Sequence, residues 1–135
     1  MKVAENIGVA QSLVPAVRTI DTEGTGVDTM GFDELVAVID VGALDLTNTD
    51  ETYTVKLQEG ATSTPTTDIT GASVSITAAN SQKLIRVKGL GTGSRLRYIR
   101  AYLDVDGTTP SIALNVTFIM GGAKWNPPES LDADV

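Results

Sequence analysis

The 135-residue sequence contains neither cysteine nor histidine. Without cysteine, the chain has no disulfide bond and no thiolate metal site. Without histidine, it lacks the commonest general base and the commonest metal ligand, and a Ser–His–Asp triad is excluded. We therefore expect a protein that is not an enzyme and that binds no metal, no cofactor and no small-molecule substrate.

Aromatic residues and long apolar runs are also scarce. Aromatics make up 4% of the residues, which is poor for a carbohydrate groove or a platform that stacks single-stranded nucleic acid. No run approaches the ~20 apolar residues of a membrane span. Residues 1–16 lack the continuous apolar core of a signal peptide. These features predict a soluble, intracellularly made protein with no membrane partner.

The net charge of −7 argues against general affinity for nucleic acid, whose phosphates repel such a chain. The charges are segregated, however, because residues 71–103 carry six basic residues and no acidic one. Either these basic residues pair with acidic strands of the same domain, or they form a positive face for an acidic partner or a second copy. The candidate partner-contact residues are Lys83, Arg86, Lys88, Arg95, Arg97 and Arg100.

Trp125, the only tryptophan, is the seventh candidate contact residue. It could stack on a sugar together with Tyr53, Tyr98 or Tyr102. More often, a tryptophan placed after the last strand pins a tail against the sheet.

Apolar and polar residues alternate along most of the chain, with the period of a β-strand. The alternation is clear in residues 51–58, 73–77, 83–88 and 111–120, and each of these runs predicts a strand. Residues 34–41 are apolar on both faces, which predicts a central strand covered on both sides. Residues 12–20 predict a strand that Pro15 confines to an edge or a bulge.

Segments rich in Gly, Asp, Asn, Thr and Pro separate these runs. Asp106-Gly107 predicts a tight hairpin between strands at 95–104 and 111–120. The whole pattern predicts an all-β fold, an antiparallel β-sandwich of jelly-roll-like type with about seven to eight short strands and flexible termini. We divide the chain into an N-terminal arm (1–12), a sandwich domain (13–122) and an acidic C-terminal tail (123–135).

The segment "KGLGTGSRLRYIR" (88–100) combines three glycines with three arginines. A phosphate-binding loop needs Gly-x-x-x-x-Gly-Lys-Ser/Thr before a helix. Here no lysine closes the loop and the following residues alternate as a strand does. We therefore interpret the segment as a hairpin whose glycines adopt positive φ, followed by a basic strand.

Five segments, taken in order, resemble a family of small virion proteins of tailed bacteriophages, in particular head decoration (cement) proteins. The first resembles the family in Gly24, Val27, Asp28, Gly31 and Phe32. The others are Tyr53–Glu59, "TDITG" at 67–71, Gly93 with Arg97–Arg100, and Ile119–Pro127. The glycine turn before Arg97 is longer here than the tight turn expected of the family.

The resemblance implies a β-sandwich without catalytic activity that is made in the host bacterial cytoplasm and coats the capsid surface. Its implied partner is the major capsid protein. Self-association is also expected, and a trimer would suit a capsid lattice. Two alternatives stay open, a tail or head–tail connector subunit and a carbohydrate-binding β-sandwich module.

Overall fold

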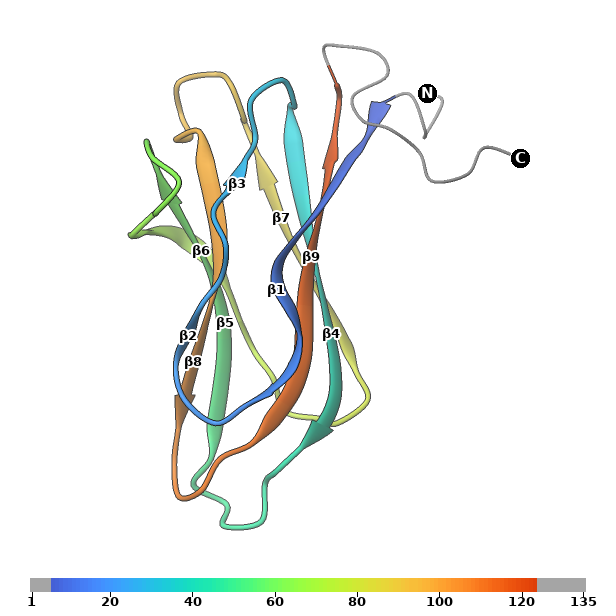
Figure 1. Cartoon of the computed structure of the whole chain (residues 1–135), viewed down its shortest axis with the longest axis vertical. Helices are drawn as coiled ribbons and strands as arrows, with labels where there is room; N and C mark the ends of the chain where they lie inside the picture. Colours follow the sequence, from blue (N-terminus) through green and yellow to red (C-terminus); the bar gives the residue numbers. More distant parts are fainter. Residues whose placement is uncertain (1–5, 124–135) are drawn as a thin grey trace, which may run out of the picture.

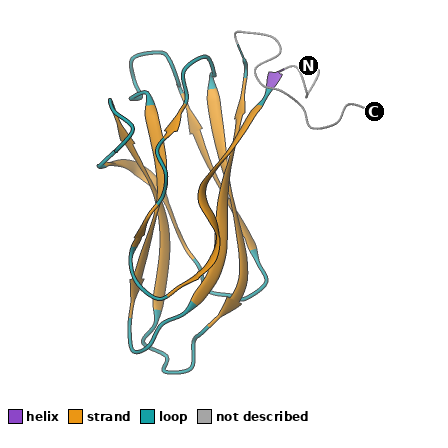
Figure 2. Ribbon diagram, viewed as in Figure 1, coloured by secondary structure: helices purple, strands orange, loops and turns teal. Residues whose placement is uncertain are grey.

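The computed structural model describes residues 6–123, which form two antiparallel β-sheets packed face to face (Figure 1). Strands run through most of this span and loops gather at the two ends of the sandwich (Figure 2). The strands are β1 (Gly8–Arg18), β2 (Thr22–Glu23), β3 (Val27–Asp28), β4 (Glu34–Leu44), β5 (Thr52–Gly60), β6 (Thr67–Ser75), β7 (Gln82–Lys88), β8 (Tyr98–Asp106) and β9 (Ile112–Gly121).

The strand order confirms the jelly-roll prediction. One sheet has the order β1-β9-β4-β7 and the other β2-β8-β5-β6, with β3 also paired to β8. Strands β2 and β3 therefore share one interrupted position beside β8. Apart from this interruption, every connection passes from one sheet to the other except the turn from β5 to β6. Such alternation between two sheets is typical of a jelly roll.

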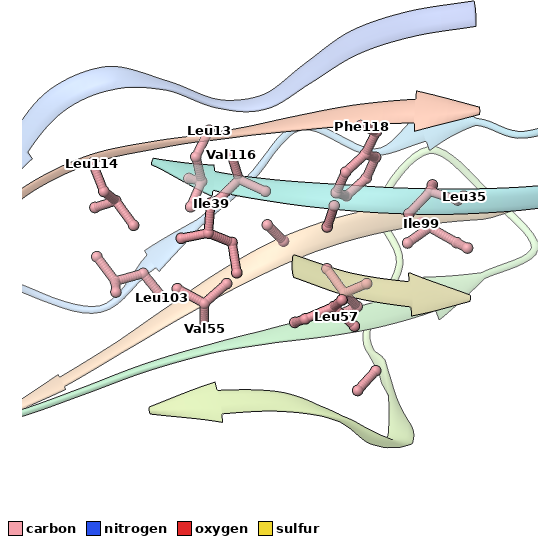
Figure 3. Close-up of a cluster of buried hydrophobic side chains, with 14 of the residues drawn as sticks. Leu13, Leu35, Ile39, Val55, Leu57, Ile99, Leu103, Leu114, Val116 and Phe118 are labelled. Atoms are coloured by element: carbon pink, nitrogen blue, oxygen red, sulfur yellow. The ribbon is translucent and has the colours of Figure 1, made fainter. Parts of the chain in front are cut away.

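The core lies between the two sheets and comes from the inward residues of the alternating strands (Figure 3). On β5, Tyr53, Val55 and Leu57 are buried, as the period-two pattern predicts. On β9, Val116 and Phe118 are fully buried and face them from the other sheet. Burial of apolar side chains, worth about 1.5–3 kcal/mol each, is what holds the two layers together.

Strand β1 confirms the expectation for the edge strand with Pro15. It pairs only with β9, and its register shifts twice, between Gln11 and Leu13 and between Leu13 and Ala16. Proline has no N–H to donate, so a bulge on an edge strand accommodates it. The strand begins at Gly8, so residues 8–12, which we assigned to the arm, belong to the sheet. The acidic tail beyond residue 123 lies outside the described residues.

The predicted hairpin at Asp106-Gly107 is wrong, because β8 and β9 belong to different sheets. Gly107 has a φ of +111°, and a Cβ at this position would lie 2.6 Å from the Cα of Glu51. Glycine is therefore needed so that the crossing loop can approach the chain at the start of β5. A turn dipeptide marks a reversal of the chain, and it does not say whether the two strands share a sheet.

The glycine-rich segment is likewise a crossing loop and not a hairpin. Gly89, Gly91 and Gly93 all have positive φ, as expected. Leu90 between them is 1% exposed, and its N–H donates to the carbonyl of Asp33 at 3.0 Å. This anchor carries the chain from β7 to the opposite sheet, so β8 begins at Tyr98 and residues 95–97 belong to the loop.

Two further predictions about strands change. Strand β4 is central in its sheet, but Val36, Val38 and Asp40 on its outward side are only partly buried. A two-layer sandwich has no third layer to cover them, so this strand is not covered on both sides. Strand β6 begins at Thr67, earlier than the expected strand at 73–77.

Candidate partner-binding surfaces

The six basic candidates do not form one continuous stripe. Lys83, Arg86 and Lys88 lie on β7, an edge strand, and their side chains are exposed. Arg95 and Arg97 lie in the loop that crosses to the other sheet. Arg100 lies on β8 in that second sheet. The crossing loop therefore divides the basic segment between the two layers.

Two of these arginines pair with acidic residues of the same domain. The guanidinium of Arg86 contacts the carboxylate of Glu34 on the neighbouring strand β4 at 2.7 Å. Arg95 contacts Glu59 at 3.4 Å, and the backbone N–H of Leu96 donates to the same carboxylate at 3.2 Å. The glutamate of β5 thus holds the crossing loop against the second sheet.

Arg97 and Asp28 form a bidentate ion pair. The Nε donates to Oδ1 at 2.8 Å and an Nη to Oδ2 at 2.6 Å. These hydrogen bonds hold the pKa of Asp28 below its ordinary value and raise that of Arg97. The carbonyl of Arg97 also accepts hydrogen bonds from the backbone and side chain of Thr29. These contacts therefore join the segment at the end of β3 to the crossing loop between β7 and β8.

Arg100 is not available to a partner, which corrects its place among the candidates. Its side chain is 7% exposed and its Nε donates to Oε1 of Gln58 at 2.9 Å. A second guanidinium nitrogen lies 3.3 Å from the carboxylate of Glu23. Glu23 lies on β2 and Gln58 on β5, the two strands that flank β8. Arg100 therefore links β8 to both of its neighbouring strands.

The first of the two interpretations of the charge pattern therefore holds for the four arginines, which pair within the domain. Within the described span, the exceptions are Lys83 and Lys88, which have no ion-pair partner. Trp125 lies outside the described residues. The carboxylates that neutralise the arginines come from β2, β3, β4 and β5, which the sequence does not place next to the basic segment.

A hollow of about 260 Å³ opens between the edge strands β6 and β7. Its basic lining comes from Arg86 and Lys88 on β7 and from Arg95 of the crossing loop. Gly71 lines the hollow on the β6 side and has a φ of +84°. A Cβ placed on Gly71 would have no atom within 4 Å, so this side of the hollow is open to solvent. Arg86 and Arg95 are already paired with Glu34 and Glu59, so Lys88 is the lining cation that has no ion-pair partner within the described span.

The outward side of the β1-β9-β4-β7 sheet is a second surface. The sequence does not reveal it, because its apolar residues come from four separate strands. Residues directly opposite in neighbouring strands point to the same side of a sheet. The register thus places Val9 beside Ile119, Ile119 beside Val36, and Val38 beside Leu84. We call this surface the apolar face after its apolar residues, which are Val9, Val17, Val36, Val38, Leu84 and Ile119. Three polar residues, Gln11, Asn115 and Thr117, lie among them on the same side.

The one available signal for this face was the doubly apolar pattern of residues 34–41. We interpreted that pattern as burial on both sides within the domain. An outward apolar residue on a two-layer sandwich is instead exposed unless another molecule covers it.

The outward side of the β2-β8-β5-β6 sheet is polar. Gln58 donates to Asp68 at 2.8 Å, and Lys56 contacts the same carboxylate at 3.0 Å. The hydrogen bond from Gln58 and then that from Lys56 hold the pKa of Asp68 below its ordinary value. The ammonium of Lys56 also lies 4.9 Å from the ring centre of Tyr102. We call this surface the polar face.

The tyrosines proposed for sugar stacking do not share one surface. Tyr53 is 1% exposed, and its hydroxyl donates to the carbonyl of Asp45 at 2.6 Å and accepts from the N–H of Ser111 at 2.9 Å. Tyr98 and Tyr102 are partly exposed on β8. Tyr53 is therefore a core residue and cannot stack on a ligand.

Comparison with protein-family models finds no match to the chain, and comparison with curated proteins finds none either. Within residues 6–123, no three carboxylates cluster closely enough to hold a metal ion. No helix in that span is long and apolar enough to cross a membrane.

Proposed function

We propose that the protein is a non-enzymatic virion structural protein that binds the outer surface of a tailed-phage head and stabilises it. Its partner is the major capsid protein. The proposal starts from the sequence resemblance to head decoration proteins. Two of the motifs that carry this resemblance meet in the fold, since Val27 pairs with Ile99 and Asp28 binds Arg97. The motifs thus belong to one structural unit.

The observation that carries the proposal is the edge strand β7, where Lys83 and Lys88 are exposed while every arginine of the basic segment is paired within the domain. Unpaired cations on a sheet edge favour docking against an acidic protein surface and fix its register. A decoration protein needs only a modest contact per copy, because the contact is repeated over many equivalent capsid sites.

The test is to mix the purified protein with heads that lack it and to measure the bound copies per head by sedimentation and gel densitometry. Stoichiometric, saturable binding that weakens with increasing salt is expected. The double variant Lys83→Gln with Lys88→Gln should bind at least about tenfold more weakly, which corresponds to the loss of about 1.4 kcal/mol of binding free energy. Arginine variants are less suitable, because they would also break ion pairs inside the domain.

A matched control is Ala61→Glu with Ser63→Glu, at exposed positions in the turn between β5 and β6. It makes the same change in net charge away from β7, and its binding should be close to that of the parent protein. Equal loss in both variants would mean that net charge alone matters. Absence of binding to heads, with labelled protein found on tails by electron microscopy, would favour the tail or connector alternative.

A further inference from the structure

The apolar face covers the outward side of the β1-β9-β4-β7 sheet and differs from end to end. Near the start of β1 and the end of β9, exposed apolar side chains project from the sheet, with Ile119 39% exposed and its neighbour Val9 47% exposed. Ile119 and Ala113, at the two ends of the face, are six residues apart on β9. They are therefore about 20 Å apart at the strand rise of ~3.4 Å per residue.

The other end of the apolar face is hollowed. A depression of about 350 Å³ is lined by Pro15 and Ala16 of the β1 bulge, by Asp40 and Gly42 of β4, and by Ala113 of β9. Gly42 has no side chain, and Ala113 contributes only a methyl group. The small residues and the bulge of β1 thus leave a space where larger side chains would have filled the surface.

The charges also differ between the two ends. Lys88 lies beside Glu34 and Arg86 at the projecting end, and Glu34 is already paired with Arg86. At the hollow end, the carboxylate of Asp40 accepts a hydrogen bond from Gln82 and has no cation partner among the described residues. Arg18, which also lies near the hollow, donates to the carbonyls of Ala16 and Leu114. The two ends therefore complement each other in shape, and Lys88 at one end and Asp40 at the other have opposite charges.

We propose that the apolar face binds the same face of a second copy of this chain across a two-fold axis. A two-fold axis that lies in the interface and runs across the strands places each end of the face opposite the other end, so each contact is made twice. Ile119 and Val9 of one copy would enter the hollow of its partner, and Lys88 would approach Asp40. The side chains at the centre, Val38 and Leu84, would be covered by their equivalents.

The test is the molar mass of the purified full-length chain by sedimentation equilibrium between 1 and 100 µM. We expect twice the 14.1 kDa mass of the chain, and we expect Ile119→Lys to return it to the mass of one chain. The matched control is Thr54→Lys, on the outward side of β5 in the polar face, which should leave the dimer intact. Since the assay uses the isolated protein, its result does not depend on binding to phage heads. Lys88 belongs to both proposed contacts, so Ile119→Lys, which keeps both lysines, is also tested on heads and should still bind them if the two contacts are independent.

Pairing of the two ends is tested separately. Because the chain has no cysteine, a variant carrying only Ala113→Cys and Ile119→Cys should form a doubly disulfide-linked dimer on mild oxidation. The variants Asp40→Lys and Lys88→Glu should each raise the dimer dissociation constant at least about fivefold, and the combination should restore it. A monomer at 100 µM, a trimer, a dimer that Ile119→Lys leaves unchanged, or the absence of cross-linking would overturn the proposal.

Discussion

The two outward faces of the sandwich handle exposed surface in opposite ways. The polar face connects its side chains to one another, so that Arg100, Gln58, Asp68 and Lys56 form one series of contacts across three strands. The apolar face leaves Val9, Leu84 and other apolar side chains between 39% and 66% exposed. Two sheets of one small domain thus present surfaces that differ in whether their interactions are completed within the chain.

This difference teaches where to look for a partner. The distribution of charge along the sequence would point to the basic segment at residues 71–103. Most cations of that segment are neutralised inside the domain, however, and contribute to the fold. Exposed apolar surface gathered on one face is the usual mark of an interaction site. Polar side chains that already have partners add little to binding because those contacts must first be broken. The unpaired lysines of β7 and the apolar face are therefore the surfaces that remain for other molecules.

The largest effect that separates the two faces is expected from Arg100→Ala. The variant removes the partner of the buried Oε1 of Gln58 and leaves a space under the polar face. We expect a loss of about 1–3 kcal/mol in the free energy of unfolding, measured by urea denaturation. Arg86→Ala on the other sheet, where the arginine side chain is 55% exposed, should cost no more than about 0.5 kcal/mol. Equal losses would show that Arg100 acts only as a surface cation.

A smaller effect, but one that depends on pH, is expected from Asp28→Asn in the Asp28–Arg97 pair. Because this pair keeps the pKa of Asp28 below its ordinary value of 3.8, its stabilisation is present above pH ~4. The stabilisation is lost as the pH falls through the lower pKa of the folded state. The variant should therefore be less stable than the parent at pH 6, by less than Arg100→Ala, and the difference should shrink as the pH falls below 4.

Urea denaturation at several pH values measures this gap. Arg97→Lys keeps the charge but loses the bidentate geometry, so its stability at pH 6 should lie between those of the parent and of Asp28→Asn. A gap that stays constant down to pH 2 would contradict the assignment to the ion pair.

The sequence predicted the layers of this fold better than its connections. Alternation placed Tyr53, Val55 and Leu57 in the core because side-chain period is a local property of a strand. The turn signal at Asp106-Gly107 could not say that the chain changes sheets there. That outcome depends on the close approach of Gly107 to Glu51, a residue far away in sequence. Local patterns do not carry such contacts.

The same limit applies to the candidate surfaces. The exposed side chain of Lys88 follows from the alternation in β7, because Lys88 lies on the side opposite Ile85 and Val87. Lys83 has the same parity as those buried residues and is exposed because it lies at the start of the edge strand. The burial of Arg100 depends on Gln58 and Glu23 from strands that are adjacent only in space. The apolar face likewise exists only once β1, β9, β4 and β7 are placed side by side. Its residues look like ordinary members of separate strands until the register is known.

The smallest expected effect tests whether every charged side chain of the polar face stabilises the folded state. Burial, followed by the nearby charges of Asp21 and Asp106, raises the pKa of Asp104 above its ordinary value of 3.8. A carboxyl with a raised pKa favours the folded state at low pH, and this contribution is lost as the pH rises through the folded pKa. Asp104→Asn should therefore stabilise the protein by up to about 0.5 kcal/mol at pH 7 and leave it unchanged at pH 3, as urea denaturation would measure.

Asp21→Asn provides the matched comparison, because it removes the other carboxylate of the same repulsive pair. Asp21 also accepts a hydrogen bond of 2.7 Å from the backbone N–H of Val105, and this bond weakens when the charged acceptor becomes a neutral amide. Asp21→Asn should therefore gain less than Asp104→Asn, or lose stability, at pH 7. If both variants gained the same stability, the hydrogen bond from Val105 to Asp21 would contribute nothing to the folded state. Removal of the charge repulsion would then account for the whole effect of Asp21→Asn.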